Sequence, residues 1–201
     1  MTEIELKAHV DDRPALRHRL KQFAEYACTV IRDDTYYGTS PQDRHKLRIR
    51  HERHLSENGT VAAEDFLVTY KRKEKRTALD GTVLEVNDER ECTVSSPDAL
   101  TAFLRDAGYS VQLEKHKEVE DWQTSVNNIK DADGTPVKAT LEICTVPPLG
   151  DFLEIEILAP SDDETTVSLA RQELSKLLEK SGIGADKIEP RYYSELLRDC
   201  T

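Results

Sequence analysis

Acidic and basic residues alternate with other residues at the N-terminal end of the chain. Glu3, Glu5 and Lys7 occupy every second position, so a β-strand would place all three side chains on one face. Clustered carboxylates favour hard divalent cations, and clustered ammonium or guanidinium groups favour the oxygens of a polyanion. A face that carries both kinds of group is therefore suited to a metal-bound polyphosphate.

The same alternation recurs in later segments of the chain. An antiparallel sheet with one solvated face would give this pattern by default. However, amphipathic helices would cover the apolar face of such a sheet, so the charged faces would all lie on its other side. If the sheet closed into a barrel of about eight strands, they would line an interior that can hold one small ligand. The residues that share a face in this way are Arg48 with Arg50, Lys71 with Lys73, Glu89 with Glu91, Lys115 with Lys117, Thr140 with Glu142, and Glu154 with Glu156.

Short strands and helices must position these side chains. Period-two segments predict strands, and an N-cap at Asp12, a C-terminal Gly108 and a cap at 161–163 delimit three helices. The polar segment 51–64 is predicted to be a loop. Asn58-Gly59, Asp80-Gly81 and Asp133-Gly134 are typical of turns. The pattern predicts an α+β fold with one mostly antiparallel sheet of eight or nine strands. The predicted strands are 3–10, 28–37, 46–51, 65–72, 86–94, 112–122, 124–130, 137–144 and 152–158, and the last predicted helix is 164–180.

Composition narrows the class of protein. The 201 residues include 39 Asp and Glu against 28 Lys and Arg, which gives a formal net charge of −11. This balance argues against a general nucleic-acid or anionic-membrane binder. The four cysteines show no CxxC spacing and are expected to be reduced thiols. No signal peptide or membrane-spanning stretch is found, so a cytoplasmic location is predicted.

Taken together, these segments resemble the CYTH superfamily, the triphosphate tunnel metalloenzymes. Glu3, Glu5 and Lys7 match its ExExK signature at the N-terminus, and segments 47–50 and 68–71 match its later basic strands. Segments 149–154 and 189–197 look most like the class IV adenylyl cyclase branch. Two departures are that Glu142 stands where the family has an aspartate, and Lys117 where it has an arginine. The resemblance covers the whole chain in the correct order, with 34–37 and 113–117 as further matching segments.

The resemblance implies one CYTH domain over residues 1–201, an eight-stranded antiparallel β-barrel tunnel with helices packed outside. It implies Mg²⁺ or Mn²⁺ as cofactor, and makes a homodimer plausible. The catalytic residues carried over are Glu3, Glu5 and Lys7. The metal ligands carried over are Glu3, Glu5, Glu89, Glu91, Glu142, Glu154 and Glu156. The triphosphate-binding residues carried over are Lys7, Arg48, Arg50, Lys71, Lys73, Lys115, Lys117 and Arg191.

Three functions fit this set of residues. The first is a class IV-like adenylyl cyclase, which converts ATP to cyclic AMP and pyrophosphate. The second is a tripolyphosphatase or thiamine triphosphatase, which hydrolyses the terminal phosphate. The third is a triphosphate-binding module without catalysis. Because the same residues would serve both reactions, the sequence leaves the choice between cyclase and triphosphatase open.

Overall fold

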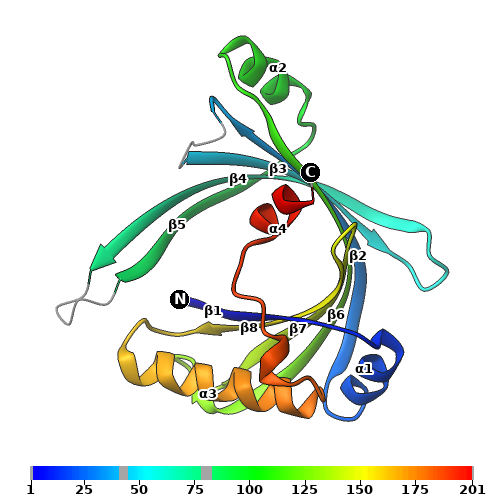
Figure 1. Ribbon diagram of the computed structural model, residues 1–201, viewed down its shortest axis with the longest axis vertical. Coiled ribbons are helices and arrows are strands. Elements are labelled where there is room, and N and C mark those ends of the chain that lie inside the picture. Colours follow the sequence, from blue (N-terminus) through cyan, green and yellow to red (C-terminus); the bar gives the residue numbers. More distant parts are fainter. Residues whose placement is uncertain (1, 41–44, 78–82, 201) are drawn as a thin grey trace. The chain divides into compact units, whose positions relative to one another are not determined.

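The computed structural model describes residues 2–40, 45–77 and 83–200; of residues 45–46, 71–77 and 83–89 it describes the backbone alone. Eight strands form one antiparallel sheet in the order β1-β8-β7-β6-β2-β3-β4-β5 (Figure 1). This is the α+β fold predicted from the sequence. The strands are β1 (Thr2–His9), β2 (Glu25–Gly38), β3 (His45–Leu55), β4 (Val61–Thr77), β5 (Val83–Val94), β6 (Ser110–Lys130), β7 (Pro136–Val146) and β8 (Gly150–Ala159). The helices are α1 (Arg13–Leu20), α2 (Asp98–Asp106), α3 (Glu164–Lys180) and α4 (Tyr193–Asp199), with a 3₁₀ turn at Ala185–Lys187.

The chain divides into two compact units. Unit 1 comprises residues 1–30 and 117–201, and unit 2 comprises residues 31–116. The long strands β2 and β6 each contribute residues to both units. Within the described residues the sheet has β1 and β5 as its outer strands. The closure of the sheet into a tunnel and the single domain over 1–201 remain predictions.

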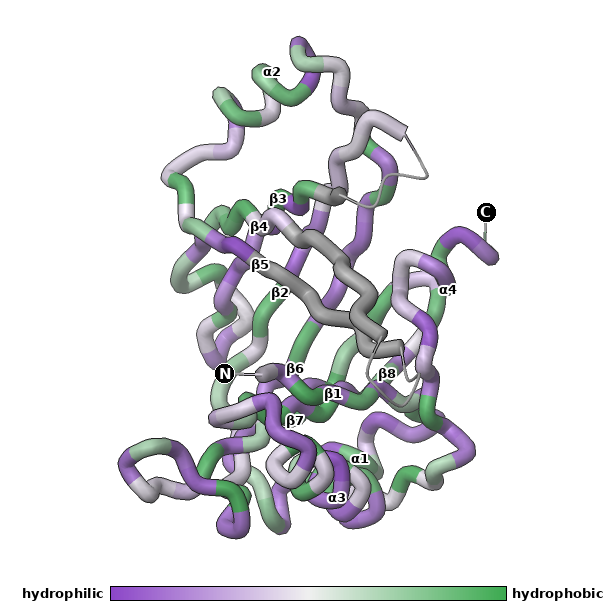
Figure 2. The backbone as a smooth tube through the Cα atoms, turned by 90° about the vertical axis from the view of Figure 1, so that its left-hand side faces the viewer, coloured by the Kyte–Doolittle hydropathy of each residue, from purple (hydrophilic) through white to green (hydrophobic). Residues whose placement is uncertain are grey.

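The main core of unit 1 lies between the sheet and α3. Leu141, Ile143 and Ile155 have no exposed surface, and they alternate along β7 and β8 with charged residues. Helix α3 packs Leu174 and Leu178 against this apolar face. The side chain of Asp163 accepts a hydrogen bond from the backbone N–H of Thr166 and so caps the helix, as predicted. The alternation of hydrophobic and hydrophilic residues can be followed along the tube in Figure 2.

A second core in unit 1 lies on the other face of the sheet. Tyr193 and Leu196 of α4 pack against Val119, Cys144 and Phe152. Cys144 and Phe152 are two residues from Glu142 and Glu154, so they share the charged face of β7 and β8. Helices α3 and α4 therefore cover opposite faces of this part of the sheet (Figure 1). The sequence predicted three main helices and did not predict α4.

Unit 2 has a smaller core of its own. Ile49 of β3, Val68 of β4 and Leu104 of α2 are buried together, with Leu100 of α2 and Tyr37 of β2 packed against them. Alternate residues of β3 and β4 therefore point toward α2, which leaves Arg48, Arg50 and Thr69 on the other face.

Two predictions about the elements are wrong. Residues 51–64 are mostly strand, because β3 continues to Leu55 and β4 begins at Val61. Only a tight turn separates them, with Gly59 at a φ of 80° as predicted for Asn58-Gly59. Residues 110–130 form one continuous strand rather than two. The turn at Asp133-Gly134 is confirmed, and the turn predicted at Asp80-Gly81 lies outside the described residues.

The four cysteines are free thiols in this structure, in agreement with the absence of a disulfide pattern. Across the described residues, none of the helices combines the length and apolar character that crossing a membrane would require.

Candidate functional site: an acidic face and a basic cluster

The charged face of unit 1 brings predicted site residues from three strands into register. Glu5 of β1 lies directly opposite Glu156 of β8, and Lys7 lies opposite Glu154. On the other side of β8, Glu142 of β7 lies opposite Glu154. Directly opposite residues in an antiparallel pair share a face, so these five side chains form one surface. We call this surface the acidic face.

Glu156 has the most perturbed carboxyl group on the acidic face. Burial, followed by the negative charges of Glu3, Glu142, Glu5 and Glu154, raises the pKa of Glu156 to about 7. Glu3 is one of the negative charges that raise this pKa. It lies opposite Leu158 rather than opposite a carboxylate, and its side chain is exposed. The carboxylates of the acidic face therefore repel the charged form of Glu156, which is a property expected of a cation-binding site.

Lys117 lies between two predicted metal ligands. It is only 4 % exposed, and its Nζ donates to Glu142 Oε2 at 2.8 Å and to Glu154 Oε2. The sequence predicted Lys117 as a triphosphate-binding residue. In the structure its ammonium group forms an ion-pair network with two carboxylates of the acidic face, and its role in triphosphate binding stays a prediction.

The C-terminal segment covers part of the acidic face. Lys7 Nζ donates a hydrogen bond to the backbone oxygen of Arg191 and lies 4.1 Å from the centre of the Tyr193 ring. The guanidinium group of Arg191 forms ion pairs with Glu189 at 2.7 Å and with Asp199 at 3.3 Å. The backbone oxygen of Arg191, and not its guanidinium group, therefore contacts Lys7, the predicted catalytic lysine.

Two residues at this surface were given no role from the sequence, although Cys144 was expected to share the charged face with Glu142. The Cys144 thiol is fully buried, and together with Glu142 and Glu154 it forms a group whose ligand atoms lie within 4.8 Å of one another. Burial, and then the Glu154 charge, raises the pKa of both Cys144 and Tyr193 well above the usual values. A cysteine without a CxxC spacing and a tyrosine in a predicted terminal motif carry no sequence signal that would distinguish them from core residues.

Unit 2 holds a cluster of basic residues around one buried carboxylate. The side chain of Asp34 on β2 is fully buried, and its Oδ1 accepts a hydrogen bond from Arg50 Nε at 2.7 Å. Lys115 Nζ lies 3.0 Å from Asp34 Oδ2. Burial would raise the pKa of Asp34, but the Arg50 hydrogen bond and the charges of Lys115 and Arg48 hold it well below its usual range. We call Asp34, Arg50 and Lys115 the basic cluster, because two cations share one carboxylate. Sequence reasoning placed Asp34 in a family motif but gave it no role.

Arg48 lies beside the basic cluster in a second network. Its NH2 donates to Thr69 Oγ1 at 2.9 Å, and Thr69 Oγ1 donates to Glu91 Oε2 at 2.6 Å. Arg48 NH2 also lies 3.4 Å from Glu91 Oε2, so Glu91, predicted as a metal ligand, contacts a predicted phosphate-binding arginine. The backbone register pairs Lys71 with Glu89. The side chains of Lys71, Lys73 and Glu89 lie outside the described residues.

Comparison with known proteins identifies the family. The model of the CYTH domain matches residues 1–193, which is nearly the whole chain. The chain belongs to the CYTH domain family. No match was found among curated proteins. CYTH proteins bind triphosphates, and CYTH enzymes depend on divalent metals.

Solved structures of the same fold cover almost the entire chain. The PH1819 protein of Pyrococcus horikoshii is 27% identical with a TM-score of 0.70, and the match covers 100% of both chains. A proposed adenylate cyclase of Vibrio parahaemolyticus is 21% identical with a TM-score of 0.69, over 98% of this chain and 97% of that chain. A proposed adenylyl cyclase of Hippeastrum, described as having a dominant triphosphatase activity, is 16% identical with a TM-score of 0.59. That match covers 100% of this chain and 97% of the other.

Proposed function

We propose that this CYTH protein is a divalent-metal-dependent enzyme that acts on a triphosphate. The observation that carries the proposal is the acidic face, in which Glu5 lies opposite Glu156 and Lys7 lies opposite Glu154. Family membership supports the same class of substrate. A cytoplasmic location and a homodimer remain predictions.

The residues of the acidic face fit a hard divalent cation. Glu3, Glu5 and Glu156 offer carboxylate oxygens, the ligands that Mg²⁺ and Mn²⁺ prefer, and the raised pKa of Glu156 reflects its burial and its repulsion by the other carboxylates. When bound, the cation would neutralise phosphate oxygens and make the attacked phosphorus more electrophilic. Glu142 and Glu154, which were also predicted as ligands, are paired with Lys117.

The basic residues are suited to bind and orient the phosphates. In the basic cluster Arg50 and Lys115 both contact Asp34, and Arg48 lies beside them. Asp34 fixes the Arg50 guanidinium group through two hydrogen bonds, at 2.7 and 3.2 Å. A guanidinium held in this way is preorganised for phosphate oxygens and for the charge of a leaving group. We assign Lys7, Arg48, Arg50 and Lys115 to triphosphate binding, with Lys71, Lys73, Lys117 and Arg191 as further candidates.

For the reaction we favour the adenylyl cyclase type, because segments 149–154 and 189–197 look most like the class IV cyclase branch. The ribose 3′-oxygen would attack the α-phosphorus of ATP, the bond from that phosphorus to the bridging oxygen would break, and pyrophosphate would leave. The hydroxyl proton would pass to a base or to water. Arg48, Arg50 and Lys115 would stabilise the negative charge of the leaving pyrophosphate.

Hydrolysis of the terminal phosphate is the second candidate. The observation in its favour is the described triphosphatase activity of the Hippeastrum protein, which shares the fold and is named as a cyclase. The same residues would bind the substrate, and water would attack the terminal phosphorus. A shift of the substrate by one phosphate would separate the two reactions.

A product assay tests the proposal. The purified protein is incubated with ATP, tripolyphosphate or thiamine triphosphate, each with Mg²⁺, with Mn²⁺ and with EDTA. Cyclic AMP together with pyrophosphate supports the cyclase, and inorganic phosphate without cyclic AMP supports the triphosphatase. Glu5→Gln should abolish either product, whereas Glu179→Gln, on the exposed side of α3, should not. If none of the three substrates is consumed with either metal, the proposed enzymatic function is wrong, and a triphosphate-binding module without catalysis is the remaining function.

A further inference from the structure

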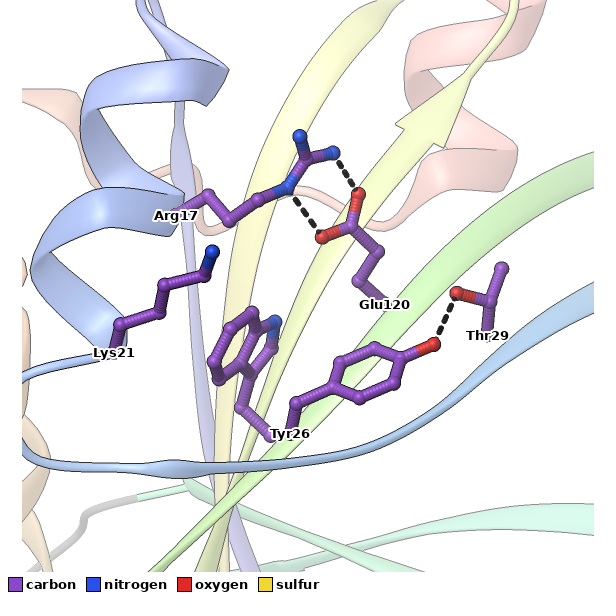
Figure 3. A pocket seen from close by; sticks show the side chains of 6 residues that line it. Arg17, Lys21, Tyr26, Thr29 and Glu120 are labelled. Atoms are coloured by element: carbon purple, nitrogen blue, oxygen red, sulfur yellow. Dashed lines mark hydrogen bonds and ion pairs between the residues drawn. The ribbon is translucent and has the colours of Figure 1, made fainter. Parts of the chain in front are cut away.

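A cavity in unit 1 lies on the sheet face opposite the acidic face. It has a volume of about 400 Å³, within the usual range for small-molecule sites. Glu120 and Trp122 of β6 line it, and they flank Asp121, which lies opposite Glu142. Since neighbouring residues of a strand point to opposite faces, the cavity is separate from the proposed metal site. The other lining residues are Arg17 and Lys21 at the end of α1, and Tyr26 and Thr29 of β2 (Figure 3).

One end of the cavity carries an excess of positive charge. The Glu120 carboxylate is shared by two arginines, with Arg17 Nε at 2.8 Å from Oε2 and Arg13 NH2 at 2.8 Å from Oε1. Lys21 adds a third cation at the edge, and its ammonium group has no ion-pair partner in the part of the chain that the structure describes. Arg13 also forms an ion pair with Asp151 at 3.6 Å, so three cations and two carboxylates leave one positive charge in a protein whose net charge is −11. This end therefore favours an anionic group.

The other end of the cavity is aromatic. The rings of Tyr26 and Trp122 meet edge to face with their centres 5.4 Å apart. Tyr26 is 51 % exposed, an unusual position for a large aromatic side chain, while Trp122 is 3 % exposed. The buried indole Nε1 of Trp122 has no hydrogen-bond acceptor among the described residues. Two rings and one indole N–H donor suit a flat ligand that also carries an acceptor.

We propose that this cavity binds a small aromatic anion, namely a planar ring that carries a phosphate or carboxylate group. The ring would contact Tyr26 and Trp122, and the anionic group would contact Lys21 and the free edge of the Arg17 guanidinium. Thr29, whose hydroxyl is 2.7 Å from the Tyr26 hydroxyl, fixes the orientation of the tyrosine ring (Figure 3). This site is independent of the proposed reaction, because its residues lie on the other face of the sheet.

Trp122 is the only tryptophan in the chain, so its fluorescence reports directly on the cavity. The experiment titrates the full chain with adenosine 5′-monophosphate, with adenosine and with inorganic phosphate, in EDTA so that no divalent metal is bound. We expect a saturable change in Trp122 fluorescence with adenosine 5′-monophosphate. Adenosine, which lacks the anion, and phosphate, which lacks the ring, should each bind at least about tenfold more weakly.

Point variants test whether the fluorescence change arises from binding in the cavity. Lys21→Ala and Tyr26→Ala, both at exposed positions, should each weaken monophosphate binding by about tenfold or more. Lys130→Ala, an exposed lysine elsewhere in unit 1, and Arg50→Ala in the basic cluster should bind as the wild type does. Circular dichroism melts establish that every variant is folded. The proposal is overturned by the absence of a saturable change, by a change that Lys21→Ala and Tyr26→Ala leave intact, or by one that Arg50→Ala removes.

Discussion

Glu5 of β1 and Glu156 of β8 lie directly opposite each other in the antiparallel register. Two carboxylates at this position repel each other, and a sheet normally avoids such a pair. With Glu3, Glu142 and Glu154 nearby, burial and repulsion raise the pKa of Glu156 to about 7. A divalent cation would reverse the sign of this interaction, so the same pair that destabilises the metal-free protein would bind the metal.

The first prediction concerns stability without metal. Between about pH 4.5, the usual pKa, and pH 7, the folded chain retains a proton on Glu156 that the unfolded chain has lost. Stability should therefore fall as the pH rises through this range. Glu156→Gln should remove this loss and raise the free energy of unfolding at pH 8 by about 1 kcal/mol, allowing for partial exposure. Urea unfolding in EDTA at pH 5 and pH 8 measures the effect, with Glu179→Gln as control. An unchanged pH slope in Glu156→Gln would contradict it.

The pairing of Glu5 with Glu156 shows which features of the site could be predicted from the sequence and which could not. Strict alternation predicted correctly that Glu5 and Glu156 each lie on the charged face of a strand. It could not predict which residues lie opposite each other, because register depends on where turns begin and on the tertiary packing. The sequence also predicted a loop at 51–64, where polar residues on both faces concealed strand ends that are held by ladder hydrogen bonds. Helix α4 was missed because its seven residues gain their stability from packing Tyr193 and Leu196, not from local propensity.

A second prediction concerns the carboxylate of the basic cluster. Asp34→Asn removes the negative charge between Arg50 and Lys115, whose side chains are only 15% and 9% exposed, and this should cost about 3 kcal/mol at pH 7. Because the pKa of Asp34 is held below its usual value, its stabilisation is fully present above about pH 4 and is lost as the pH falls further. The difference between wild type and variant in urea unfolding should shrink toward pH 2. Arg105→Ala, an exposed residue of α2, is the control, and a difference that does not depend on pH would refute the assignment.

A third prediction concerns Lys117. Lys117→Met leaves Glu142 and Glu154 side by side without their shared ammonium group, which should lower the stability in EDTA by about 3 kcal/mol. Adding Mn²⁺ should raise the melting temperature of this variant more than that of the wild type, because the metal ion can take the place of the ammonium group. Thermal melts with and without Mn²⁺ test this, and Lys130→Met should behave as the wild type does. Equal melting temperatures of wild type and Lys117→Met in EDTA would disprove it.

A fourth prediction concerns the contact of α4 with the acidic face. The Tyr193 ring packs edge to face on Phe152, with ring centres 5.1 Å apart, and the Lys7 ammonium group lies over the Tyr193 ring. Tyr193→Ala should cost about 3 kcal/mol of stability, whereas Tyr193→Phe keeps the ring and should cost less than about 1 kcal/mol. Chemical unfolding compares the two variants. If Tyr193→Phe were as unstable as Tyr193→Ala, the hydroxyl and not the ring would hold the helix.

The binding of Mn²⁺ to the acidic face tests the central claim most directly. Isothermal titration of the metal-free wild type should show saturable binding of Mn²⁺ at pH 8, with release of protons at pH 7, where Glu156 is partly protonated. The double variant Glu5→Gln with Glu156→Gln should lose this binding, and Glu179→Gln should retain it. Saturable binding of equal affinity in the double variant and the wild type would show that the metal lies elsewhere, and would contradict the account.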